Sequence, residues 1–264
     1  MFSRFVSALA TALVALAAGE GLPGPQAPKI NVGGVVHAAT SRPAPDNYIS
    51  PGAIISIYGT GLAGETREVR ASDLVNGYLP ETLANVSVYF GLAPAPLFYV
   101  SPTQINAQAP TGLQPGEWEV TVRYNRLESR ATVTVRAYAP GLFPVARHTD
   151  GRLVDGNGPA RPREWLLFFG TGFGPTTPAL LAGALAPLEP VPMVDAQGRE
   201  RAIEVQIGGV ALDPADIYYA GLAPGYAGLY QFNLRVPPGT AGLAEVLVKV
   251  GEEWTPPVRI PVAP

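Results

Sequence analysis

A Gln-x-Asn motif occurs twice in the chain, once with Gln104 and Asn106 and once with Gln231 and Asn233. Residues two apart on a strand face the same side, so each motif predicts two neighbouring amides on one surface. Such amides can hydrogen-bond to the hydroxyl groups of a sugar. Aromatic rings in the same segments could stack on the sugar, and they belong to Tyr99, Tyr219, Tyr226 and Tyr230.

We therefore expect a ligand-binding site made of Tyr99, Gln104, Asn106, Tyr219, Tyr230, Gln231 and Asn233. A structural alternative stays open, because amides also satisfy backbone groups at turns and edge strands. Whether the motifs bind a ligand or support the fold is not decided by spacing. The sequence predicts no catalytic residue, no metal ligand and no cofactor.

Few groups in the chain could carry out acid–base chemistry. The two histidines are His37 and His148, and there is no cysteine. A hydrolase would need His148, Asp150 or Asp155 to meet in one pocket, and no serine stands in a nucleophile-elbow motif. The Asp-Gly pairs at 150–151 and 155–156 lack the third acidic ligand and closing glutamate of a calcium loop, so we expect two turns there.

Gly-Thr-Gly occurs at 59–61 and at 170–172, each time after an apolar segment. Neither motif is followed by the Gly-Lys-Ser/Thr and helix that a phosphate-binding loop requires. We therefore expect a bulge or corner that ends a strand, where only glycine fits the backbone geometry.

The composition excludes several functional classes. The 264 residues include 30 Gly and 29 Pro, with 15% charged and 47% hydrophobic residues and a formal net charge of -3. No basic surface is available for a phosphate backbone, so nucleic-acid binding is not expected. The lack of cysteine excludes disulfides, thiolate catalysis and Cys-ligated metals.

The N-terminus has the features of a secretory signal peptide. Arg4 precedes an apolar run over 5–18, and Ala15-Leu16-Ala17 gives a small-x-small cleavage pattern. The run is shorter than the roughly 20 residues that span a membrane, so we expect cleavage after residue 17 and no membrane insertion afterwards. The predicted location is secreted or periplasmic.

The chain also repeats itself once. The two Gly-Thr-Gly motifs are 111 residues apart (170 − 59), and the two Gln-x-Asn motifs are 127 apart (231 − 104). Two copies of about 110 residues correspond to two domains of ordinary size. We expect a signal peptide at 1–17, an N-terminal extension at 18–34, a first sandwich at 35–139, a stiff linker at 140–148 and a second sandwich at 149–264.

Each copy has the alternation of antiparallel strands. Residues 117–124 and 131–136 alternate with period two around a hairpin connection at 125–128. The second copy repeats this pattern at 244–250 and 258–262. Many short strands joined by Gly/Pro turns predict an all-β fold of two tandem immunoglobulin-like sandwiches.

At this level the chain resembles immunoglobulin-like IPT/TIG domains, through its Gly-Thr-Gly-Phe-Gly corner and closing hairpin. Over about 35–262 it is also similar to a Solibacter-type uncharacterised C-terminal domain of secreted acidobacterial proteins. The segments that carry this resemblance are Pro51–Ile54, Leu79–Leu83, Ala95–Pro102, Gln104–Asn106, Asp150–Gly151, Pro159–Pro162 and Ala220–Gly225. One departure is Arg163-Glu164, where that family has glycine after Arg-Pro. The resemblance implies architecture and compartment, and it implies no reaction.

The sequence is therefore interpreted as a non-catalytic binding, adhesion or structural module at the cell surface. Its partner would be a neutral polysaccharide or a surface protein, because aromatic and amide groups outnumber charges. A periplasmic assembly chaperone is the alternative, and it would need the basic residues Arg147, Arg161 and Arg163 in a cleft between the domains. A hydrolase is the third interpretation.

Overall fold

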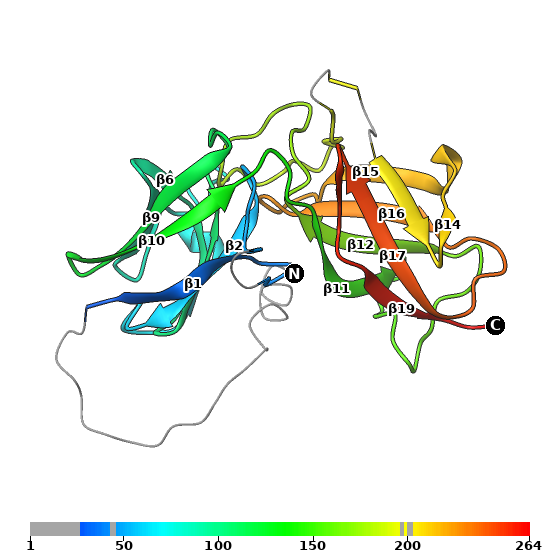
Figure 1. Cartoon of the computed structure of the whole chain (residues 1–264), viewed down its shortest axis with the longest axis horizontal. Coiled ribbons are helices and arrows are strands. Elements are labelled where there is room, and N and C mark those ends of the chain that lie inside the picture. The colour runs from blue at the N-terminus through cyan, green and yellow to red at the C-terminus, as the bar shows by residue number, and fades with distance from the viewer. Residues whose placement is uncertain (1–26, 43–45, 196–197, 200–202) are drawn as a thin grey trace.

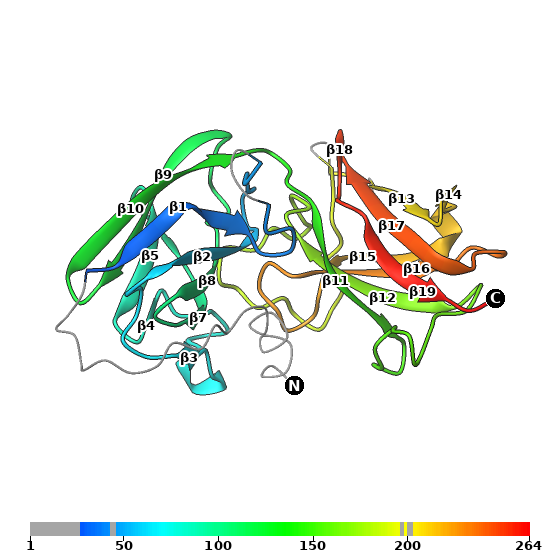
Figure 2. The ribbon, with the colours of Figure 1, turned by 60° about the horizontal axis from the view of Figure 1, so that its bottom comes forward.

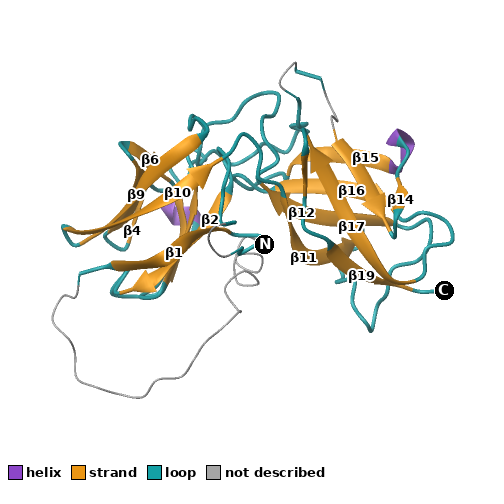
Figure 3. Cartoon of the chain, in the orientation of Figure 1, coloured by secondary structure: helices purple, strands orange, loops and turns teal. Residues whose placement is uncertain are grey.

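The computed structural model describes residues 27–42, 46–195, 198–199 and 203–264 (Figure 1). The predicted signal peptide at 1–17 lies outside the described residues. Within them the regular structure is strand, connected by turns and loops, and the helical segments are two single 3-10 turns, Ala71–Asp73 and Pro214–Asp216 (Figure 3). The described residues include no helix long and apolar enough to cross a membrane.

The first half is a sandwich of two antiparallel sheets. One sheet has the order β1-β2-β8-β7-β3, and the other has the order β10-β9-β5-β4 with β6 paired to β5. The strand bounds are Lys29–His37 (β1), Ile54–Thr60 (β2), Arg67–Glu68 (β3), Thr82–Leu83 (β4), Val86–Phe90 (β5), Ala93–Ala95 (β6), Leu97–Val100 (β7), Gln104–Gln108 (β8), Gly116–Tyr124 (β9) and Leu127–Val135 (β10). Alternate residues of both sheets fill one core, as Val86, Val88 and Phe90 do from β5.

The second half repeats this arrangement. Its sheets have the orders β11-β12-β16-β15 and β14-β13-β17-β18, with β19 paired to β17. The strand bounds are Gly141–His148 (β11), Trp165–Thr171 (β12), Ile203–Ile207 (β13), Val210–Ala211 (β14), Ile217–Leu222 (β15), Tyr230–Arg235 (β16), Gly242–Val250 (β17), Glu253–Trp254 (β18) and Val258–Val262 (β19). The predicted all-β fold of two tandem immunoglobulin-like sandwiches is therefore confirmed (Figure 2).

The two halves can be compared residue by residue, because their strands have matching registers. Positions in β2 correspond to positions in β12 that are 111 residues later, and β8 corresponds to β16 with a shift of 127. In each half a short segment before β2 or β12 pairs in parallel with the last strand, through Ile49 and Val135 or through Ala160 and Val262. The likeness thus extends to single hydrogen-bonded pairs.

The Gly-Thr-Gly motifs end β2 and β12, as predicted. A Cβ on Gly59 would lie 2.2 Å from the carbonyl oxygen of Lys29, and one on Gly170 would lie 2.5 Å from that of Gly141. These contacts are too close for any side chain, so glycine allows the edge strand to approach the corner.

The structure corrects the prediction of a linker at 140–148. Residues 141–148 form β11, an edge strand of the second half, and the predicted extension at 18–34 contains the start of β1. Pro144 made the segment look like a connector. It falls where the register of β11 against β12 shifts between Leu142 and Ala146, and its missing N–H costs no ladder bond there.

Arg163 occupies a position that favours glycine. Its φ is +67°, and the equivalent residue of the first half (163 − 111 = 52) is Gly52 with a φ of +74°. A non-glycine residue in this region costs roughly 1–2 kcal/mol. Arg163 therefore forms the same turn as Gly52, but with a strained backbone.

We expect Arg163→Gly to raise the free energy of unfolding by about 0.5–1 kcal/mol, since the relief of strain exceeds the added chain entropy of glycine. Arg163→Ala should give no such gain, because alanine keeps the strain. The reciprocal change, Gly52→Ala, should lower stability by about 1–2 kcal/mol. Urea denaturation measures all three variants, and a stabilising Arg163→Ala would contradict this account.

Candidate functional site

The outer face of the first-half sheet, on strands β2, β7 and β8, is covered by the second half. Ile54, Leu79 and Phe98 from the first half form a shared apolar cluster with second-half residues. Those second-half residues are Phe143, Phe169, Ala223, Ala227 and Leu229. We call the first-half side of this contact the covered face. The shared apolar cluster joins the two sandwiches, because residues of both halves pack together in it.

Thr171, in the second Gly-Thr-Gly corner, forms the polar centre of this contact. The backbone N–H of Ile54 donates to Thr171 Oγ1 at 2.9 Å, and that hydroxyl donates to the carbonyl of Gly228 at 2.7 Å. Ser50 Oγ donates to the carbonyl of Gly172 at 3.2 Å. Because Thr171 is fully buried, loss of its hydroxyl would leave backbone groups unsatisfied on both sides.

His37 lies in the same contact and is neutral. Its Nδ1 accepts from the backbone N–H groups of Ala39 and Thr40, both at 3.3 Å. The proton is therefore on Nε2, which donates to the carbonyl of Thr171 at 3.3 Å. Burial lowers the pKa of His37 to about 4, because the imidazolium would lose its hydration, although the carbonyl of Thr171 acts in the opposite direction.

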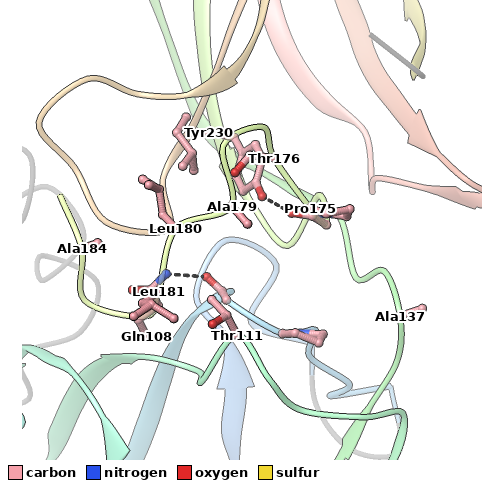
Figure 4. Close-up of a pocket in the computed structure, with 15 residues that line it drawn as sticks. Gln108, Thr111, Ala137, Pro175, Thr176, Ala179, Leu180, Leu181, Ala184 and Tyr230 are labelled. Carbon is pink, nitrogen blue, oxygen red and sulfur yellow. Dashed lines mark hydrogen bonds between the residues drawn. The ribbon is translucent and has the colours of Figure 1, made fainter. Parts of the chain in front are cut away.

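Beside this contact lies a cavity of about 390 Å³ that both halves line (Figure 4). Gln108 fixes its edge: its Oε1 accepts from the N–H of Gly183 at 2.6 Å, and its Nε2 donates to the carbonyl of Gly52 at 3.0 Å. The lining also includes Thr111, Thr176, Leu180 and Tyr230, and none of its described residues is charged. The basic anchors that a chaperone would need are thus not part of this cavity.

The amides of the first Gln-x-Asn motif are bonded to each other and to a serine. Gln104 Nε2 donates to Asn106 Oδ1 at 2.8 Å, and Ser56 Oγ donates to the same oxygen at 2.9 Å. Asn106 is buried, so it cannot contact a ligand in this state. Tyr99 is half-buried and packs on the shared apolar cluster.

The second motif lies nearer the surface. Gln231 Nε2 donates to Asn233 Oδ1 at 2.8 Å, and both side chains are partly exposed. Tyr219 is half-buried, and its hydroxyl donates to the carbonyl of Leu222 at 2.7 Å. Tyr230 is buried against Phe173 with its hydroxyl donating to the carbonyl of Gly174, and burial raises its pKa. Of the seven predicted residues, Asn233 and Gln231 are thus best placed to meet a ligand.

Asn233 belongs to an aromatic surface on the outer face of β12, β15 and β16. A hollow of about 320 Å³ is lined there by Thr149, Trp165, Leu167, Tyr218 and Asn233. The rings of Trp165 and Tyr218 are 6.2 Å apart between centroids and meet edge to face at 71°. We call these five residues the open face.

Sequence reasoning chose Tyr219 and missed Tyr218. A β-bulge between Ile217 and Tyr219 breaks the alternation of the strand, and it leaves Tyr218 72% exposed. Trp165 begins the apolar strand β12 and is half-buried. The Tyr-Tyr pair was the available signal, but no feature of the sequence places the bulge.

The open face and the covered face are the same surface of the repeated unit. Trp165 corresponds to Ile54 (54 + 111), and Tyr218 corresponds to Phe98, since each is the unpaired residue at the bulge of its strand. Phe98 is 8% exposed, and the second half covers it. Tyr218 is 72% exposed.

His148 corresponds to His37 but has the opposite electrostatics. Its Nδ1 lies 2.6 Å from Glu164 Oε1, and its Nε2 lies 3.0 Å from the carbonyl oxygen of Gly158. Both neighbours accept, so the ring donates from both nitrogens as an imidazolium. The Glu164 carboxylate raises the pKa of His148, against the effect of its burial.

The acidic residues near His148 hold turns. Asp155 Oδ1 accepts from the N–H groups of Asn157 and Gly158, and Asp150 pairs with Arg152 at 2.7 Å. The described part of the chain brings no three His, Asp or Glu side chains together as metal ligands. The residues named for a hydrolase therefore have structural partners here.

Comparisons with known proteins agree with this architecture. Residues 43–143 match the family described as the IPT/TIG domain, which accounts for most of the first half. No curated protein matches the chain.

Three solved structures are similar in part. SGBP-B of the Bacteroides ovatus mixed-linkage glucan utilization locus, in complex with a mixed-linkage heptasaccharide, is 13% identical with a TM-score of 0.36, covering 84% of this chain and 45% of that one. SGBP-B from a complex xyloglucan utilization locus in Bacteroides uniformis is 12% identical with a TM-score of 0.26, covering 89% and 50%. Domains 5-6 of the S-layer protein SbsC are 11% identical with a TM-score of 0.27, covering 89% and 98%. The chain spans half or less of the two SGBP-B chains.

Acid should weaken the folded state through His37. The unfolded side chain titrates near pH 6.5 and the folded one near pH 4, so stability falls as the pH drops below 6.5, by about 2 kcal/mol between pH 8 and pH 5. His37→Gln should remove about this amount of the acid loss, as measured by urea denaturation at each pH.

His148→Gln is the matched control with the opposite sign. The raised pKa of His148 stabilises the fold below pH 6.5, and that contribution is lost as the pH rises through the folded value. Removing it should steepen the acid loss. An unchanged pH profile in His37→Gln would show that His37 is not held neutral.

Proposed function

We propose that the protein is a non-catalytic binding module, secreted or periplasmic, that holds a macromolecular partner on its open face. The observation that carries the proposal is the pairing of the two faces. In the first half this surface is buried under another sandwich, and its equivalent in the second half presents the exposed Tyr218 with the half-buried Trp165 beside it. Exposed aromatic groups around a hollow are typical of binding surfaces.

The compartment rests on the apolar run and cleavage pattern of residues 1–17. The finer family assignment, to the Solibacter-type C-terminal domain of secreted proteins, rests on the motif residues alone. Both are part of the proposal. The strained turn at Arg163 lies where the chain departs from that family, and it leaves the strand register intact.

The candidate partners are a surface protein and a neutral polysaccharide. Trp165 and Tyr218 provide rings for stacking, and Asn233 provides an amide at the same hollow, with Gln231 bonded behind it. Arg235 lies over the Trp165 ring at 5.9 Å and is paired with Asp216 at 3.8 Å, so the surface carries little free charge. A sugar chain with many hydroxyl groups suits this chemistry.

Replacing Tyr218 should weaken binding without unfolding the protein, since its side chain is largely exposed. We expect Tyr218→Asp to weaken the binding of any partner at least tenfold, as loss of an aromatic anchor does. The immobilised chain would be probed with neutral glucans and with purified cell-envelope proteins. The control is Leu92→Asp, an even more exposed apolar position on the first half. A partner that both variants retain equally would contradict the proposal.

A further inference from the structure

The covered face shows which kind of surface fits the open face. Inside the chain, the strand-end corner of one sandwich, centred on Thr171, sits on the outer sheet face of the other. Corner and face are both parts of the repeated unit, so each half carries one of each. The contact inside the chain uses the corner of the second half and the face of the first half. It leaves one face and one corner over.

The face left over is the open face. Trp165 takes the place of Ile54, whose N–H donates to Thr171 Oγ1. Tyr218 takes the place of Phe98. Both replacements are larger aromatic groups. The surface is therefore apolar at the positions that are buried in the first half.

The corner left over belongs to the first half, and it is exposed. Val32 lies in the irregular stretch of β1 that matches the stretch of β11 containing Phe143, and Thr60 corresponds to Thr171. Phe143 and Thr171 are buried in the contact between the halves, but Val32 and Thr60 are fully or largely exposed. Tyr58, the counterpart of Phe169, is half-buried beside them. We call Val32, Tyr58 and Thr60 the corner surface.

From these two solvent-facing surfaces we infer that the open face binds the corner surface of a second copy of this chain, in a head-to-tail contact that repeats the one between the halves. The inference rests on the proposed function, since it names the partner of the same face. The two surfaces are different and lie on different halves. Such a heterologous contact does not close on itself in a pair, so copies can add one after another.

The new contact should be weaker than the one it repeats. The corner of the second half is extended by residues 223–229, which bury Ala223, Ala227 and Leu229 in the shared cluster. The first half joins its β7 and β8 by Ser101, Pro102 and Thr103 alone. A smaller apolar area predicts reversible association, with a Kd on the order of 10 µM.

Sedimentation of the purified chain between about 1 µM and about 200 µM tests this inference. We expect the average mass to rise with concentration past the dimer. Val32→Asp and Tyr218→Asp should each weaken association at least tenfold, and Leu92→Asp should leave it unchanged. All three positions are exposed, so thermal unfolding should be unaffected.

A mixture of the two inactive variants gives the sharpest result. Val32→Asp keeps its open face and Tyr218→Asp keeps its corner surface, so an equimolar mixture should form a dimer that cannot grow. A wild-type chain that stays monomeric overturns the inference, and so does a dimer that both variants still form. If the monomeric chain holds a glucan or an envelope protein that only Tyr218→Asp releases, the proposed function stands and the copy is the wrong partner. If Tyr218→Asp changes nothing, both fall.

Discussion

The hydrogen bond from the Ile54 N–H to Thr171 Oγ1 determines how the rest of the molecule is arranged. It joins the first residue of β2 to the last residue of β12, and the shared apolar cluster surrounds it. A buried amide that lacks a partner is costly, so the two halves are held together by polar satisfaction as well as by apolar contact. One sheet face is covered as a result, and its counterpart is left open.

Duplication followed by divergence accounts for the asymmetry of the surface. His37 and His148 occupy the same position of the repeat, yet one is a neutral donor in the contact and the other an imidazolium beside Glu164. Likewise Phe98 is buried and Tyr218 is exposed. These pairs sit on strands of matching order, β1-β2-β8-β7 and β11-β12-β16-β15, so their different surroundings come from what packs against each half.

Much of the fold could be predicted from the sequence. The alternation at 117–124 and a hairpin after it are local features, and local features are readable. The connection predicted at 125–128 is the two-residue turn Asn125-Arg126, with the positive φ values of a tight hairpin, and β10 already begins at Leu127. The strand at 141–148 was hidden by Pro144, because only its partner strand shows that the register shifts there. The candidate site was harder still. Asn106 is buried by a tertiary contact, and Tyr218 is exposed at a bulge. Neither feature leaves a mark on the spacing of residues.

Native-state hydrogen exchange at the Ile54 amide tests most directly whether the halves form one packed body. If the second half covers the first as described, this amide should exchange as slowly as amides in the centre of β2, because Thr171 must leave before it can open. If it exchanges as fast as a surface loop while the core of β2 stays protected, the halves separate in solution. The distinction between a covered and an open face would then be lost.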